Sequence, residues 1–255
     1  MTLQRKQQAS QWTGWQNVRA KSVSSRIIEQ VWDALFRGEL KSGDRLGSEV
    51  ELAQKLGVSR VPVRDAFRTL EALGIIAIKV GAHGGAFIAA GDPKRFADAL
   101  AVQLKLVGIS IEEMFDSQIA IETMAAELAA QRATAADLNH LRDLLGELQD
   151  MTQKPLSRTA TVRFTEVSMR FHEALVDAAH NRALAAQFKA LRIVMEPIYL
   201  RRTTDAVARR VVASHKDLVD SIARNDAEGA RTLMRKRLEV IRAHQMMKAV
   251  DAPDK

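Results

Sequence analysis

The chain has 255 residues, of which 47% are hydrophobic and 27% charged; this fits a globular protein long enough for two domains. It contains no cysteine, which excludes disulfides and thiolate metal sites and favours the cytoplasm. No apolar run approaches the roughly 20 residues of a membrane span, and the first ten residues lack the apolar core of a secretory signal.

The net charge of +7 is unevenly distributed. Residues 1–90 hold 13 Lys and Arg against 8 Asp and Glu, whereas the remainder holds 25 against 23. Positive charge gathered in the shorter part favours a nucleic-acid partner. Within that part, residues 1–20 are expected to form a mobile basic arm that includes Trp12 and Trp15. An arm that touches DNA or a partner subunit is the alternative.

Residues 22–36 predict an amphipathic helix, which is followed by the turn-rich link GELKSGDRL. Residues 48–90 then predict a helix, a tight turn, a second helix and a two-stranded hairpin, in that order. The apolar face of the helix at 22–36 is formed by Val23, Ile27, Ile28, Val31 and Leu35.

The two helices within residues 48–90 have clear start and stop signals. Ser48 and Glu51 predict a capping box at the start of the first helix, and Gly57 supplies the positive φ of the turn. The second helix is expected to have Ser59 as its N-cap and to end at Gly74. Its core face at helical spacing comprises Val63, Phe67, Leu70 and Leu73.

Arg60, Arg64 and Arg68 recur every four residues on the second helix and share a face beside the core face. Rows of this kind are often only solvated. Here the row follows a capped helix and a glycine turn, and it precedes a hairpin with the glycine-rich tip GAHGG. This order favours insertion into the DNA major groove, where arginine bonds guanine bidentately and also neutralises phosphates. The hairpin is expected to lie as a wing over the adjacent backbone or minor groove.

The run GVSRVPVRDAFRTLEALGII, with the wing KVGAHGGAFIA, resembles the winged-helix domain of GntR-type bacterial transcription regulators. The resemblance implies a winged-helix DNA-binding domain at residues 21–90. His83 at the wing tip is a further candidate for DNA contact. The family often has S-E-R-E-L in the first helix, and Val50 in S-E-V-E-L implies one lost base or phosphate contact. The operator contacts implied by the resemblance come from Ser59, Arg60, Arg64 and Gly81.

Residues 91–250 are expected to form an all-helical domain, because the strand pattern stops near Pro93 and helical periodicity continues. Ser110, Thr134 and Asp226 offer N-caps or first-turn carboxylates. An antiparallel bundle of six or seven helices is therefore predicted, giving a mainly α protein overall. The predicted helical segments are 93–107, 111–133, 135–151, 158–179, 183–201, 205–225 and 226–248.

The stretches RFHEALVDAAHNRAL and SHKDLVDSIARNDAEGARTLMRKRL resemble the FCD-type effector-binding domain of the FadR subfamily of GntR regulators. In many members an aspartate and three histidines hold a metal ion that accepts the effector's carboxylate. The resemblance places His172 and His215 at two of these positions, Ser168 at the aspartate position and Arg237 at the third histidine. Two ligands are fewer than zinc sites use, and a guanidinium repels cations. No tightly bound metal or other cofactor is therefore expected; a divalent metal, if present, would be held by the two histidines.

Arg237 in place of a metal ligand indicates direct, bidentate binding of an anionic effector. A structural ion pair with Glu122 or Asp220 is the alternative. Gln118 stands where the family tends to have an arginine, so a second anion contact is expected to be missing. The two histidines can also be satisfied core residues.

These features predict a cytoplasmic, ligand-responsive transcription regulator that binds an inverted-repeat DNA operator as a homodimer and responds to a small organic acid. No catalytic residue and no membrane partner are expected. One alternative is a constitutive DNA-binding regulator with a non-functional pocket. The other is a helical metalloenzyme fused to a DNA-binding module, with His172 and His215 activating water. Neither an activated nucleophile nor a paired carboxylate supports the enzyme.

Overall fold

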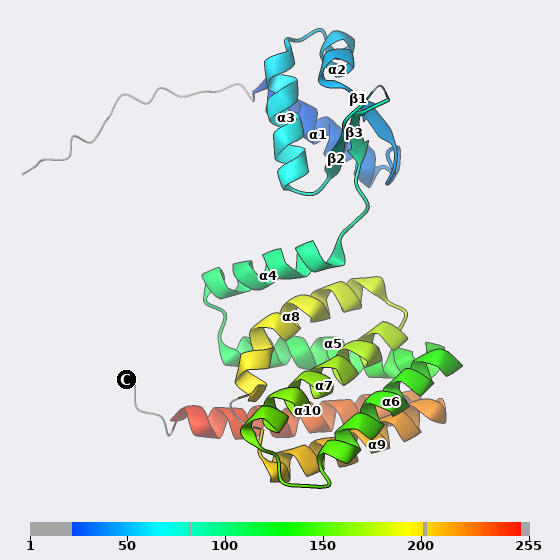
Figure 1. The fold of residues 1–255 in the computed structure, drawn as a ribbon, viewed down its shortest axis with the longest axis vertical. Helices are drawn as coiled ribbons and strands as arrows, with labels where there is room; N and C mark the ends of the chain where they lie inside the picture. Colours follow the sequence, from blue (N-terminus) through cyan, green and yellow to red (C-terminus); the bar gives the residue numbers. More distant parts are fainter. Residues whose placement is uncertain (1–21, 82, 201–202, 251–255) are drawn as a thin grey trace, which may run out of the picture. The chain divides into compact units, whose positions relative to one another are not determined.

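The computed structural model describes residues 22–81, 83–200 and 203–250, with side chains up to residue 243. These residues form ten helices and three short strands, so the expected mainly α class is confirmed (Figure 1). They divide into two compact units between Asp92 and Pro93. The predicted arm, with its two tryptophans, lies outside the described residues. None of the described helices is long and apolar enough to cross a membrane.

The first unit packs three helices around one apolar core. The capping box predicted at Ser48 and Glu51 is confirmed, because each backbone N–H is bonded by the other residue's side chain. Gly57 adopts a φ of 66°, in the left-handed region that the turn requires. These helices are α1 (Val23–Phe36), α2 (Glu49–Leu56) and α3 (Arg60–Ala72).

Leu73 was placed in the core by its spacing, and this prediction is wrong. Helix α3 ends at Ala72, and Leu73 is its C-cap with 57% of its surface exposed. The helical period no longer applies at a residue where the helix stops. Gly74 follows with a φ of 72°, as expected for a residue that ends a helix.

The sheet of this unit has three strands rather than the two of the predicted hairpin. Strands β2 (Ile76–Lys79) and β3 (Gly85–Ile88) pair antiparallel, with Ile76 opposite Ile88. The third strand, β1 (Arg45–Gly47), pairs antiparallel with β3, giving the order β1-β3-β2. The residues of β1 were predicted to belong to a turn-rich link, because three residues with an irregular register carry no alternating pattern.

The second unit consists of seven helices whose ends lie within one or two residues of the predicted ones. Ser110 and Thr134 form capping boxes with Glu113 and Asp137. Asp226 accepts a hydrogen bond from the Gly229 N–H at 2.9 Å, as expected for a capping carboxylate. The helices are α4 (Pro93–Val107), α5 (Ile111–Arg132), α6 (Ala135–Met151), α7 (Arg158–Ala178), α8 (Arg182–Leu200), α9 (Asp205–Ala223) and α10 (Ala227–Val250).

Helix α5 is the central element of this unit. It contacts α7, α8, α9 and α10, and the main apolar cluster draws its side chains from five helices, α5, α6, α7, α9 and α10. Two polar residues of α5, Gln118 and Glu122, are buried with 2% and 0% of their surface exposed. Buried polar groups need partners, so the centre of the bundle is where a polar site is to be sought.

Candidate nucleic-acid interface and ligand site

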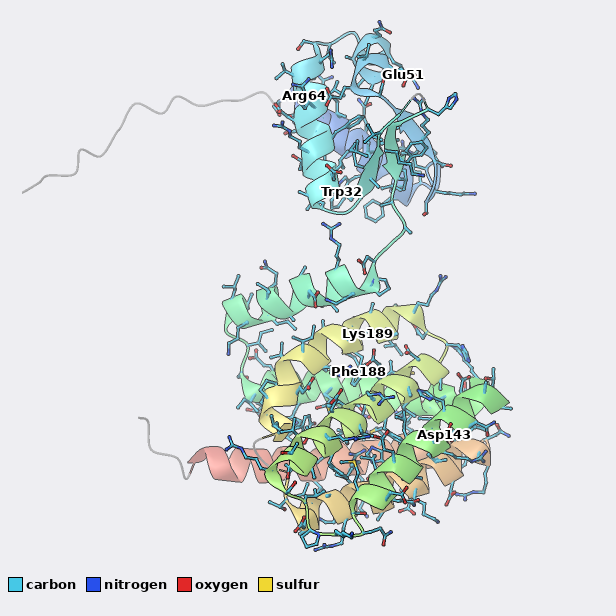
Figure 2. The ribbon with its side chains drawn as sticks, viewed as in Figure 1. Trp32, Glu51, Arg64, Asp143, Phe188 and Lys189 are labelled. Carbon is cyan, nitrogen blue, oxygen red and sulfur yellow. The ribbon has the colours of Figure 1, made fainter. Side chains whose placement is uncertain are left out.

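Helix α3 separates its apolar and basic faces as its sequence predicts. Val63, Phe67 and Leu70 are buried, whereas Arg60, Arg64 and Arg68 are exposed. Figure 2 shows Arg64 and Glu51 toward the end of this unit where α2 meets α3, and Trp32 toward the other end. The three arginines are therefore available to a large anionic partner.

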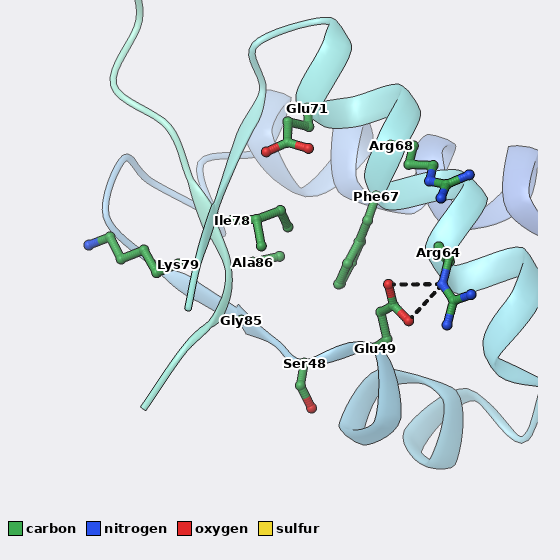
Figure 3. Close-up of a pocket in the computed structure, with 10 residues that line it drawn as sticks. All are labelled: Ser48, Glu49, Arg64, Phe67, Arg68, Glu71, Ile78, Lys79, Gly85 and Ala86. Carbon is green, nitrogen blue, oxygen red and sulfur yellow. Dashed lines mark hydrogen bonds and ion pairs between the residues drawn. The ribbon is translucent and has the colours of Figure 1, made fainter. Parts of the chain in front are cut away.

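Glu49, in the first turn of α2, holds two of these arginines. Its carboxylate accepts hydrogen bonds from the Nε of Arg64 at 3.1 and 3.3 Å (Figure 3). One of its oxygens lies 3.6 Å from the Nη2 of Arg60. Glu49 thus orders both guanidinium groups and offsets part of their charge. The sequence did not suggest this role, because Glu49 and Arg64 are 15 residues apart and meet only through the turn.

Ser59 is the N-cap of α3 by its backbone angles, as predicted, but its hydroxyl makes no capping hydrogen bond. The residue is exposed beside Arg60. A hydroxyl that is not used by its own helix remains able to bond a phosphate or a base edge.

The wing contains Gly81 and His83, both exposed. It is tied to α2 through Arg45 of β1, which donates hydrogen bonds to the Gly84 carbonyl at 3.0 and 3.1 Å and to Glu51 at 2.8 Å. Gly85 has a φ of 119°, and a Cβ there would lie 2.7 Å from the carbonyl oxygen of Gly47. Only glycine permits so close an approach of the two strands. Neither strand β1 nor the role of Arg45 in holding the wing was predicted from the sequence.

An open hollow of about 430 Å³ lies between α3 and the wing, within the first unit. In Figure 3, Phe67 and Ile78 face it, whereas Arg68 and Lys79 point away from it on opposite sides. Lys79 lies over the ring of Phe87 at 4.5 Å. The carboxylates of Glu49 and Glu71 also line the hollow, so its lining is of mixed charge, and the cations available to a polyanion are those at its edges.

The second unit contains a group of buried and half-buried polar side chains, here called the central polar cluster: Gln118 and Glu122 of α5, His172 of α7, Tyr199 of α8, His215 of α9 and Arg237 of α10. The Tyr199 hydroxyl donates to the Gln118 carbonyl at 2.7 Å, and the Gln118 amide donates to Glu122 at 2.5 Å. The other oxygen of Glu122 accepts from Nδ1 of His172. Five helices thus each contribute to one cluster.

Sequence reasoning included four of these six residues in its predicted effector site. Glu122 entered only as a possible partner of Arg237, and Tyr199 was missed. Tyr199 is the only tyrosine of the chain. Its role became visible only in the fold, which places its hydroxyl within hydrogen-bond distance of α5. Burial and the nearby charge of Glu122 raise the pKa of Tyr199, so its hydroxyl stays protonated and donates. Ser168, at the expected aspartate position, is buried one turn before His172.

The two histidines lie with their ring centres 5.2 Å apart. Nδ1 of His215 donates to the Val211 carbonyl at 2.8 Å. Burial lowers the pKa of both rings below the ordinary value, that of His215 furthest, and the charge of Arg237 lowers both. Each ring uses Nδ1 for a protein partner, which leaves Nε2 for another group.

Arg237 carries the positive charge of the cluster. Its Nη1 atom is buried and has no hydrogen-bond partner. Burial lowers its pKa, and the charge of Glu122 opposes this shift. Among the described residues no carboxylate forms a direct ion pair with it, and Asp220 pairs with Lys216 at 3.2 Å instead. The ion pair considered as an alternative is therefore not formed as a contact.

The donor set does not fit a metal ion. The described residues contain no group of three or more His, Asp or Glu placed to hold one, and Glu122 is already bonded by Gln118 and His172. A guanidinium beside the two imidazoles would repel a divalent ion by several kcal/mol, since even a unit charge at 4 Å costs about 4 kcal/mol at an effective dielectric of 20. The chemistry of these residues suits an anion.

Two family models match the chain. The model described as bacterial regulatory proteins, gntR family, matches residues 23–88, and the FCD domain model matches residues 113–240. The first match spans α1, α2, α3 and the sheet, and the second spans every residue of the central polar cluster.

Relatives cover most of the chain. The transcriptional regulator YcbG of Bacillus subtilis is 25% identical over 92% of this chain and 94% of its own length. The galactonate operon transcriptional repressor of Escherichia coli is 28% identical over 81% of this chain and 90% of its own length. The solved structure of a GntR protein from Streptococcus agalactiae matches the fold with a TM-score of 0.57 at 19% identity, covering 87% of this chain and all of that one.

Proposed function

This chain belongs to the gntR family of bacterial regulatory proteins and carries an FCD domain, and from that premise we propose that it is a ligand-responsive regulator of the FadR subfamily. It is a DNA-binding transcriptional regulator, as its relatives are, and not an enzyme. In our proposal it binds an inverted-repeat operator as a cytoplasmic homodimer, and a small organic acid in the central polar cluster changes its affinity for that operator.

The DNA half of the proposal rests on the exposed arginine row of α3. Arginine in the major groove bonds guanine bidentately, and the basic wing residues add phosphate contacts. One such helix reads only a short half-site, so two-fold symmetry is needed to give a specific operator. The contacts are assigned to Ser59, Arg60, Arg64, Arg68, Gly81 and His83.

One observation carries the ligand half: the buried Nη1 of Arg237 has no partner. A buried donor on a cation without an acceptor costs free energy, and a carboxylate at this atom would remove that cost. Attraction between the two charges is about 4 kcal/mol at 4 Å and an effective dielectric of 20. His172, His215, Ser168 and Gln118 surround the anion in this proposal, and no metal takes part.

The E. coli relative is named as the repressor of the galactonate operon. Galactonate is a sugar acid, with one carboxylate and several hydroxyls. For this chain, sugar acids are therefore the first class of ligand to screen, together with smaller carboxylic acids. A ligand must bind one arrangement of the protein better than the other in order to change DNA affinity.

The test combines metal analysis with thermal shift. Purified full-length protein, made in metal-replete medium, is measured for bound metal and then screened against carboxylic and sugar acids. We expect less than stoichiometric metal and a rise in Tm with at least one acid. The rise should vanish in Arg237→Met and persist in the control Arg235→Met, because Arg235 is an exposed residue of the same helix that faces Glu239 at 3.8 Å.

The other outcomes identify the rival functions. Near-stoichiometric metal would contradict the assignment of Arg237 as the anion-binding group. Absence of any acid-induced shift, with operator binding intact, would instead identify a constitutive DNA-binding regulator.

A further inference from the structure

Helix α1 carries two exposed aromatic side chains that the arginine row and the wing do not use. Trp32 is 43% exposed and Phe36 is 82% exposed, and their ring centres lie 6.0 Å apart. On the other side of the helix, Ile27 and Val31 are buried in the core of the first unit. Single exposed apolar residues are common, but two neighbouring aromatic rings on one side of a helix indicate a surface for contact.

Two carboxylates lie on the same side of α1. Glu29, Trp32, Asp33 and Phe36 follow one another at helical spacing, so they share one face, here called the α1 aromatic face. Glu29 and Asp33 are exposed, and Arg26 is exposed one turn nearer the start of the helix. Near the two rings the charge is therefore negative. A partner that fits this face combines aromatic side chains with positive charge.

Residues 1–21 have that composition. They contain Trp12, Trp15 and four Lys or Arg, with no Asp or Glu, and they join α1 at its N-cap, Ser22. Trp15 can reach up to about 24 Å from Ser22 through seven residues of extended chain, whereas Trp32 lies about 15 Å from Ser22 along the helix. The arm is thus long enough to turn back along α1 and bring its tryptophans to this face.

We propose that residues 1–21 dock on the α1 aromatic face of their own chain, with the two tryptophans of the arm against Trp32 and Phe36 and its basic residues near the two carboxylates. Aromatic pairs add specific geometry to the burial of apolar surface. Attachment to the start of α1 gives the arm a high effective concentration at this face, which a second copy or a separate protein lacks. Trp32 lies toward the end of the unit opposite to Arg64 (Figure 2), so the docked arm leaves the recognition helix free.

The first experiment uses introduced thiols in the full chain, which has no cysteine of its own. Thr13→Cys places a thiol between the two tryptophans of the arm, and Glu29→Cys places one on the α1 aromatic face. Gln30→Cys replaces Glu29→Cys in the control, because Gln30 is exposed but lies about 100° further round the helix. Under mild oxidation we expect the Thr13–Glu29 pair to form an intramolecular disulfide several times faster than the control pair, since the bridge requires facing Cβ atoms.

Two outcomes of this experiment overturn the inference. Equal rates for the two pairs would show that the arm has no preferred place on α1. A disulfide that joins two chains, seen as a covalent dimer on a non-reducing gel, would place the arm on a second copy instead.

A second arm of the experiment assigns the docking to the aromatic rings. In the background of the Thr13–Glu29 thiol pair, Phe36→Ala should slow the bridge several-fold without disturbing the core, because Phe36 is 82% exposed. Val61→Ala, at a residue of α3 that is 63% exposed, is the control and should leave the rate unchanged. An unchanged rate in Phe36→Ala overturns the role of the face.

The tryptophans of the arm are tested in the same background. Trp12→Gln combined with Trp15→Gln should slow the bridge as much as Phe36→Ala does, and should leave operator affinity unchanged. Loss of operator affinity with an undiminished rate of bridge formation would identify DNA as the partner of the arm, and the inference would fail.

Discussion

Arg64 and Arg237 are the same amino acid in opposite settings, and the difference separates the two units of the molecule. Arg64 is 44% exposed in its side chain and is ordered by Glu49 at 3.1 Å. Arg237 has a buried guanidinium atom without a partner, on a helix that packs against α5. The first arginine faces water and exchanges its weak partner easily; the second has one guanidinium nitrogen, Nη1, that is buried and makes no hydrogen bond.

The comparison teaches what each charge is suited to bind. An exposed, loosely paired cation contributes little to folding and is ready for a large polyanion that supplies many phosphates. A buried, unpaired cation costs free energy that only a small, well-placed anion can recover. In the proposed function, the same side chain therefore serves surface recognition of DNA in one unit and enclosed recognition of an anion in the other.

The largest expected effect is a loss of operator binding when the exposed Arg64 is replaced. Arg64→Ala should weaken specific operator binding by about 1–3 kcal/mol per subunit, because a bidentate base contact is lost. Fluorescence anisotropy with an operator selected from random duplexes measures it. Arg37→Ala is the control, since Arg37 is equally basic and pairs with Glu39 at 2.7 Å. Unchanged specificity would overturn the recognition-helix assignment.

The next prediction concerns the buried arginine. Arg237→Met should raise the free energy of unfolding of the ligand-free protein by about 1 kcal/mol, because a buried unpaired donor is replaced by an apolar chain of similar length. Chemical denaturation measures this, with Arg235→Met as the control and little change expected there. Destabilisation by several kcal/mol would instead reveal a structural ion pair, since breaking one exposes its partner as an uncompensated charge.

The two buried histidines, His172 and His215, predict that the stability of the folded protein depends on pH. Their pKa values are lower in the folded protein than in the unfolded chain, so the unfolded chain binds more protons near pH 6. Stability is therefore fully present above about pH 6.5 and falls as pH drops below it, by up to about 1.4 kcal/mol per pH unit for each histidine. Urea midpoints between pH 7.5 and 5.5 measure this. His215→Phe should flatten the slope, and an unchanged slope in this variant would contradict the prediction.

The smallest effect belongs to Glu49. Glu49→Gln frees Arg60 and Arg64 from an exposed ion pair that contributes about 0.2–1 kcal/mol. Non-specific DNA affinity should therefore rise by up to about fivefold, while the ratio of specific to non-specific affinity falls because the two guanidinium groups are less ordered. Binding to operator and scrambled duplexes at two salt concentrations tests this. An unchanged ratio would show that Glu49 does not position the arginines.

Local patterns in the sequence were enough to predict most helices. The capping box at Ser48, the N-cap residues Ser110 and Thr134 and the apolar periodicity placed helix ends to within one or two residues. Strand β1 was not predictable, because its three residues form a strand only by pairing with β3, which lies about 40 residues later in the chain. Leu73 was misplaced because a periodic pattern does not indicate where a helix stops.

The candidate site was predictable only where one helix carries it. The arginine row of α3 can be recognised from its spacing, whereas Glu49 reaches Arg64 across a turn. In the second unit, family resemblance indicated His172, His215 and Arg237. The hydrogen bond between Tyr199 and Gln118 could not be predicted, because the two residues are 81 positions apart in the sequence. Hydrogen-bond networks across helices depend on packing that periodicity does not encode.

The ties around Arg45 have a mechanical consequence. Pairing of β1 with β3, the close approach of Gly85 to Gly47 and the bonds of Arg45 to Gly84 and Glu51 fasten the wing to the start of α2. These contacts restrict bending of the wing relative to the start of α2. In the proposed homodimer, a ligand would therefore act by changing the spacing of the two DNA-binding units, and we expect affinity for an isolated half-site to respond less than affinity for the paired sites.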